Sequence, residues 1–176
     1  MLAKFPTAPE ILPASTPAAA CSKRSILRFI SLYQFDPILR FDQEHRRRDL
    51  HKDPEMAKYR DLITWADHLI FIFPIWWSGM PAILKGFIDR VFAANFAYSY
   101  KKGHLQGKSG WIIASHNTPA FALPFVQDYG KVLKNQVLKL CGIFPVKLTE
   151  LNGVERKTDQ ERQEMLKKIR QLASQI

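Results

Sequence analysis

His68 to Phe96 reads HLIFIFPIWWSGMPAILKGFIDRVFAANF, and this stretch decides the fold. Its apolar opening, residues 69–73, is too short for a helix and is closed by Pro74, which predicts a buried parallel strand. A turn rich in proline and glycine follows, and apolar residues then recur at helical spacing from Ile83 to Phe92. A strand, an irregular turn and a helix N-terminus together form the place where open α/β sheets hold ligands.

Five further elements are predicted from periodicity and turn residues. Trp111 to Ser115 is a second apolar run, which predicts another buried strand, and a polar turn from Ser115 to Pro119 offers a second ligand position. The others are helices at Glu55–Trp65 and Phe125–Leu140, an edge strand at Ile143–Leu148 containing Pro145, and a last amphipathic helix after the capping box Thr158–Glu161, which carries Met165, Leu166, Ile169 and Leu172.

The N-terminal part of the chain differs from the rest. Residues 1–24 are rich in proline and alanine and contain no recognisable strand, because their four prolines would each remove a backbone donor. The first plausible strand is Ser25–Tyr33, SILRFISLY. We therefore expect an atypical segment at 1–24 and a single domain over 25–176, which is long enough to bury its own core.

The order FPIWWSGMPAILKGFIDRVF, followed by FAYSY and KKGHLQGKSGW, resembles the signature of the flavodoxin-like NAD(P)H:quinone oxidoreductases. That family includes ancillary subunits of potassium-efflux systems. The resemblance runs from about residue 32 to the C-terminus. It implies an α/β fold of three layers, a parallel sheet with helices on both faces, in which the first strand is missing or degenerate here.

The resemblance also implies a cofactor, FMN, with FAD as a possibility, and NAD(P)H as co-substrate. Hydride would pass from NAD(P)H to the flavin and then to a quinone-like acceptor. The implied flavin contacts are Pro74, Ile75, Trp76, Trp77, Ser78 and Gly79 along the ring, and Ser115, His116, Asn117 and Thr118 at its pyrimidine edge. Without the resemblance, the two tryptophans could equally well cap the hydrophobic core.

His116 is a weak candidate for a catalytic proton donor to reduced quinone. The alternative, an ordinary loop histidine bonded to the backbone, carries more weight, since hydride transfer needs no protein acid to begin. Relatives place a tyrosine a few residues further on, where this chain has Phe121 or Ala122. Cys21 and Cys141 lie far apart without metal-ligand spacing, so we predict neither a metal site nor a disulfide.

The formal charge of +10 does not by itself indicate a nucleic-acid partner. Its excess lies in scattered lysines between Lys101 and Glu150, a pattern more typical of solvated faces, and no recognition motif accompanies it. No apolar run approaches the roughly 18 residues of a membrane span, and the start lacks the continuous apolar middle of a signal peptide. We expect a cytoplasmic protein.

Three functions remain open at this point. The first is the flavin-dependent oxidoreductase, the second a regulatory subunit of a membrane transporter, and the third a relative that keeps the fold but cannot hold FMN. The last arises because residues 1–24 offer no loop for the FMN phosphate, which predicts weak FMN binding. A homodimer is expected because Trp76, Trp77 and the aromatic residues of 92–100 exceed what one small domain can cover.

Overall fold

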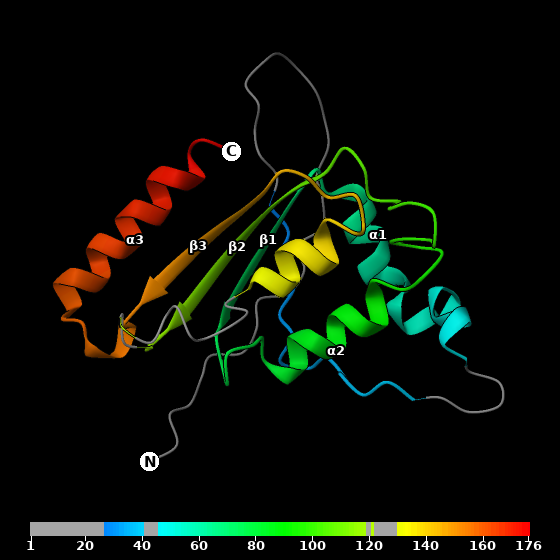
Figure 1. Ribbon diagram of the computed structural model, residues 1–176, viewed down its shortest axis with the longest axis horizontal. Helices are drawn as coiled ribbons and strands as arrows, with labels where there is room; N and C mark the ends of the chain where they lie inside the picture. The colour runs from blue at the N-terminus through cyan, green and yellow to red at the C-terminus, as the bar shows by residue number, and fades with distance from the viewer. Residues whose placement is uncertain (1–26, 41–45, 119–120, 122–129) are drawn as a thin grey trace.

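The computed structural model describes residues 27–40, 46–118, 121 and 130–176. Its centre is a parallel sheet of three strands in the order β1-β2-β3: β1 (His68–Pro74), β2 (Ser109–His116) and β3 (Val146–Asn152). Figure 1 shows their carboxyl ends together at one end of the sheet. The strands predicted at 69–73 and 111–115 are confirmed, and β2 is central in the described sheet.

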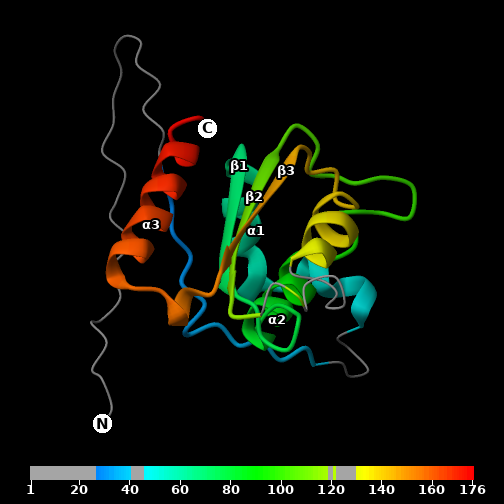
Figure 2. The same ribbon diagram turned by 60° about the vertical axis from the view of Figure 1, so that its left-hand side comes forward.

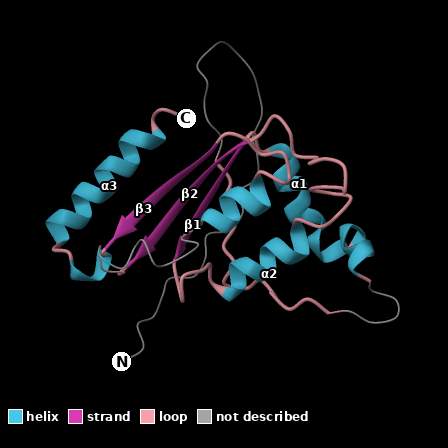
Figure 3. Cartoon of the chain, in the orientation of Figure 1, coloured by secondary structure: helices cyan, strands magenta, loops and turns pink. Residues whose placement is uncertain are grey.

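Helices cover both faces of this sheet, as the three-layer prediction requires (Figure 2). One face carries α1 (Ala57–Trp65), α2 (Ala82–Val91) and the helical segment η4 (Leu133–Leu138), and the other carries α3 (Asp159–Ala173). Short helical turns complete the described elements (Figure 3): η1 (Arg47–Lys52), η2 (Pro54–Met56) and η5 (Val154–Arg156).

α2 forms because its apolar residues recur on one face and Pro81 occupies the N-cap, where a missing backbone donor costs nothing. The residues of that face, Leu84, Phe87, Ile88 and Val91, are all buried. They join a core whose largest fully buried side chains are Trp111, Ile112, Leu133, Leu138, Ile143, Val91 and Cys141. α2 therefore anchors the turn that precedes it firmly to the sheet.

The last helix begins where the sequence predicts. Thr158 and Glu161 form the reciprocal capping box, with the Thr158 side chain accepting from the Glu161 amide. Leu166 is 48% exposed, and no residue of α3 is buried. α3 therefore covers its side of the sheet loosely.

Other boundaries also differ from the prediction. Residues 27–33 are irregular instead of forming the strand predicted at Ser25–Tyr33, and Phe29 and Tyr33 lie 88% and 91% exposed. An apolar run becomes a strand only when another strand supplies hydrogen bonds, and none of the described strands pairs with it. The final strand begins at Val146 instead of Ile143. Of the helix predicted at Phe125–Leu140, residues 131–138 are helical and 125–129 lie outside the described residues.

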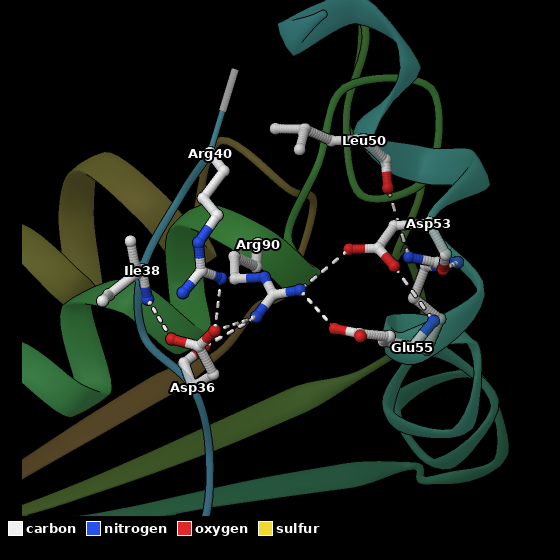
Figure 4. A network of polar contacts seen from close by, with 8 residues as sticks. Asp36, Ile38, Arg40, Leu50, Asp53, Glu55 and Arg90 are labelled. Atoms are coloured by element: carbon white, nitrogen blue, oxygen red, sulfur yellow. Dashed lines mark hydrogen bonds and ion pairs between the residues drawn. The ribbon is translucent and has the colours of Figure 1, made fainter. Parts of the chain in front are cut away.

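The charged segment before α1 is organised by one residue of α2, Arg90, whose side chain is only 8% exposed. Its guanidinium donates to the backbone oxygen of Asp36 at 2.8 Å, to Asp53 Oδ2 at 3.1 Å and to Glu55 Oε2 at 2.8 Å (Figure 4). The sequence indicated solvated, mutually paired charges here. The structure shows in addition that three acidic residues converge on one buried cation, which fixes the segment against α2.

β1 has a strand neighbour on only one side within the described part of the chain. On the face toward α3, its side chains Ile70 and Ile72 are 42% and 72% exposed. β1 is therefore an edge strand of the described sheet, and the expectation of a missing or degenerate first strand, which falls on residues outside the described ranges, stays a prediction.

Candidate functional site

Three turns meet at the carboxyl ends of the strands: residues 74–79 after β1, 115–118 after β2 and 152–156 after β3. Backbone hydrogen bonds tie them to one another. The amide of Ile75 donates to the oxygen of Ser115 at 2.7 Å, and the amide of Gly153 donates to the oxygen of His116 at 2.7 Å. The sequence-predicted residues of the first two turns are thus held side by side, at the place where α/β sheets bind ligands.

The first turn is a tight hairpin closed by Trp76 and Gly79, whose amides and oxygens pair reciprocally at 3.0 Å. Its central residues, Trp77 and Ser78, have φ values of 50° and 64°, in the left-handed region that favours glycine. Such strain on residues other than glycine concentrates at functional sites. The backbone conformation therefore supports a functional role for this turn.

The side chains of this turn face solvent. Trp76 is 61% exposed and Trp77 fully exposed, so the alternative in which both cap the core does not fit. Two flat apolar rings at the end of a central sheet are a surface suited to a planar aromatic ligand. Figure 1 places this turn between the end of β1 and the start of α2.

The second turn presents polar groups. Ser115, Asn117 and Thr118 are half-buried, while the His116 side chain is only 2% exposed and its Nε2 lies 3.8 Å from Glu150 Oε2. Burial lowers the pKa of His116 below its ordinary value, and the neighbouring Glu150 opposes that shift. The buried His116 side chain thus lies beside Glu150 of β3. Proton transfer from His116 to a quinone stays a prediction.

The third turn was not identified as a site from the sequence. It is joined to the second turn, because Asn117 Oδ1 accepts from the Glu155 amide at 3.1 Å. A polar pocket of about 390 Å³ lies between the two turns, lined by Asn117, Thr118, Asn152, Gly153, Arg156, Lys157 and Glu161. A glycine directly after a strand, followed by two basic residues and a capping box, is the signal that could have found it.

A second cavity, of about 350 Å³ and largely apolar, lies between α2 and η4. It is lined by aromatic and aliphatic residues that include Phe92, Tyr98, Val137 and Cys141. Burial raises the pKa of the Cys141 thiol to about 12, so this cysteine is protonated at neutral pH and packs as a small apolar residue. Tyr100, two residues after the cavity-lining Tyr98, is fully exposed.

Within the described ranges, no cluster of three or more histidine, cysteine, aspartate or glutamate side chains could hold a metal ion. No helix among the described residues has the length and apolar character needed to cross a membrane.

The chain is similar in sequence and structure to known proteins. A family model described as "Flavodoxin-like fold" matches residues 16–173. The crystal structure of Smu.1420 from Streptococcus mutans is 69% identical, with a TM-score of 0.80 over 82% of this chain and 80% of that one. An NAD(P)H:quinone oxidoreductase from Methanothermobacter marburgensis is 27% identical, with a TM-score of 0.66 over 80% and 75%.

A curated relative from Haemophilus influenzae, described as an uncharacterized NAD(P)H oxidoreductase, is 36% identical over 81 residues. The match covers 45% of this chain and 40% of that protein. The chain thus matches less than half the length of the first curated relatives.

Proposed function

Since the chain belongs to the flavodoxin-like fold family, we propose that it is an oxidoreductase that binds FMN and transfers hydride from NAD(P)H to a quinone-like acceptor. One observation carries this proposal: the exposed Trp76 and Trp77 lie in a strained turn hydrogen-bonded to a polar turn at the carboxyl ends of β1 and β2. The similarity to oxidoreductases that use NAD(P)H supports the same reaction class.

The residues present fit the flavin ring. An isoalloxazine has apolar faces and a polar rim, and the two turns offer flat apolar side chains beside hydroxyl and amide groups. When bound, the flavin supplies hydride acceptance and donation. The chain's part is to orient the ring with Trp76 and Trp77, to exclude water from its faces, and to hydrogen-bond its rim from Ser115 and Thr118.

A homodimer is part of the proposal. The segment after α2 carries the fully exposed Tyr100, and the apolar cavity beside it is open to solvent. Exposed aromatic surface next to an apolar hollow is typical of an interface. Light scattering that finds a monomer at micromolar concentration would count against this part of the proposal.

A specific observation favours a second candidate, a relative with impaired FMN binding. β1 lacks a strand neighbour on one side within the described residues, and the phosphate loop of the complete fold follows the strand expected there. A regulatory subunit remains the third possibility, with a membrane transporter as its partner. The flavin content of the purified protein separates the second candidate from the other two.

The test is a titration of the full chain with FMN, followed by flavin fluorescence, and NAD(P)H oxidation with a panel of quinones. We expect Trp76→Ala with Trp77→Ala to weaken FMN binding by about 10- to 100-fold through lost ring contacts. Trp65→Ala is the matched control, because Trp65 is 44% exposed at the end of α1, beside Arg28, and lies before the start of β1, whereas the turn follows the end of that strand. Equal losses in both variants would contradict the proposed site.

A further inference from the structure

The hydrogen bonds at the two ends of β1 show which of its backbone groups face outward. The oxygen of Asp67 accepts from the amide of the first residue of β2 at 3.0 Å, and the Ile75 amide donates to Ser115 at 2.7 Å. The odd-numbered residues of this stretch therefore point toward β2, since backbone groups alternate in direction along a strand. The amides and oxygens of Ile70 and Ile72 consequently point to the free edge of the sheet.

This edge lacks the features that usually protect an edge strand. Residues 69–73 carry no charge, and Pro74 comes only at the end of the strand. No described residue is hydrogen-bonded to the outward backbone groups of Ile70 and Ile72, and both side chains are exposed. An edge with unpaired donors and acceptors and no charge is a template for pairing with a further strand.

Residues 28–35 run alongside this edge without pairing with it. The Arg28 guanidinium lies 4.4 Å from the ring centroid of Trp65, the last residue of α1, and the ring of Phe35 lies 5.5 Å from that of Tyr59 in the first turn of α1. Because α1 runs opposite to β1, this segment follows β1 from its amino end toward its carboxyl end (Figures 1 and 2). It shares no ladder hydrogen bond with β1.

We infer that the free edge of β1 binds one extended, uncharged apolar segment of another polypeptide chain, which adds to the sheet as a further strand. Its side chains on one face would lie beside the buried Phe73, and those on the other face beside Ile70 and Ile72. A charge in either place would lose its water without gaining a partner. The chemistry of the edge therefore selects an apolar strand.

Two observations point to another chain as the source of this strand. Residues 1–26 of this sequence carry four prolines, each of which removes a ladder donor, and the stretch after the last of them contains Lys23 and Arg24. β1 of a second copy is uncharged, but it is already paired with its own β2. Because residues 28–35 flank the edge, the added strand must arrive without a sheet attached to it.

The experiment titrates the full chain into a fluorescein-labelled peptide of five alternating valine and isoleucine residues with two lysines at each end, followed by fluorescence anisotropy. We expect saturable binding. A peptide with proline at its central position should bind at least about tenfold more weakly, because it loses one ladder hydrogen bond and leaves a buried group unpaired. Equal binding of both peptides would overturn the inference, and so would the absence of saturable binding.

A variant of the edge provides the complementary test. Ile72→Pro removes a donor that faces outward and keeps the ladder to β2, so it should weaken peptide binding at least about tenfold. Ile72→Val keeps the donor and should bind as the wild type does, and circular dichroism checks that both variants fold. Wild-type affinity in a folded Ile72→Pro variant would contradict the inference.

Amide hydrogen exchange measured by NMR locates the added strand even if Ile72→Pro does not fold. The Ile70 and Ile72 amides should exchange fast in the chain alone and at least about tenfold more slowly with the peptide, while the Phe71 amide, which points to β2, stays protected throughout. Protection of Ile70 and Ile72 without peptide would show that this chain already occupies the edge. Protection that grows with the concentration of the chain would assign the edge to a second copy. Either result overturns the inference.

Discussion

Gly86 of α2 lies directly against Pro37, so close that a β-carbon at position 86 would overlap the backbone of that proline. By helix propensity alone, Gly86→Ala should stabilise α2 by about 1 kcal/mol. We expect the opposite sign, a loss of about 1 to 3 kcal/mol, because the neighbouring contact is rigid backbone. Urea unfolding measures the change, and Lys85→Ala on the exposed side of the same helix is the control. A more stable Gly86→Ala variant would contradict the contact.

The buried Arg90 fixes the segment before α1 through hydrogen bonds from its guanidinium. Arg90→Met keeps the apolar stem and removes the donors to Asp36, Asp53 and Glu55, so we expect the free energy of unfolding to fall by about 2 to 3 kcal/mol. Arg40→Met removes an exposed guanidinium that bonds to Asp36, and its effect should be much smaller. Equal effects in thermal unfolding would show that burial of Arg90 contributes nothing.

The first turn stores backbone strain at Ser78, where φ is 64°. Ser78→Gly should therefore raise the free energy of unfolding by about 1 kcal/mol, because glycine adopts this conformation without the steric cost. Ser174→Gly, at the right-handed C-cap of α3, is the control and should be neutral or slightly destabilising. A loss of stability in Ser78→Gly would mean that its side chain contributes more than the strain costs.

His116 gives stability a dependence on pH. Burial lowers its pKa in the folded state below 6.5, so the unfolded chain holds the proton more tightly. The free energy of unfolding is then highest above this value and falls as the pH drops from 6.5 through the lowered folded pKa. Urea unfolding across this range should show a smaller fall in His116→Gln and an unchanged fall in His104→Gln, which alters an exposed histidine.

Part of the fall should remain in His116→Gln. Burial also lowers the pKa of His68, whose Nδ1 lies 2.6 Å from Ser109 Oγ. If the fall is the same in wild type and His116→Gln, then His116 does not carry the dependence.

Local pattern was enough to predict the centre of the fold. The run at 69–73, the following turn and the periodic residues from Ile83 to Phe92 each specify their structure through neighbours in sequence, and all three are confirmed. Ser25–Tyr33 failed as a predicted strand because pairing depends on a partner far away in sequence. The role of Arg90 could not be predicted for the same reason, because its three acidic neighbours come from two separate parts of the chain.

The candidate site likewise has parts that local sequence pattern predicts and a part that depends on tertiary contacts. The first two turns follow recognisable apolar strands, so residues 74–79 and 115–118 could be named from the sequence and lie side by side in the structure. The third turn follows β3, whose polar and apolar residues alternate less clearly, and no site was predicted there from the sequence. Its link to the second turn, from the Glu155 amide to Asn117, is a tertiary contact that no local pattern encodes.

One side of β1 has no strand neighbour among the described residues, and this has a consequence for handling the protein. Residues 69–73, LIFIF, contain no charge and no proline, and Ile72 on this strand is 72% exposed. Short segments of this kind stack readily into cross-β assemblies when strands of other molecules reach them. We expect concentrated solutions to form thioflavin-positive aggregates that begin at this segment, and Ile72→Lys to delay them by adding a charge that a stacked strand must accommodate.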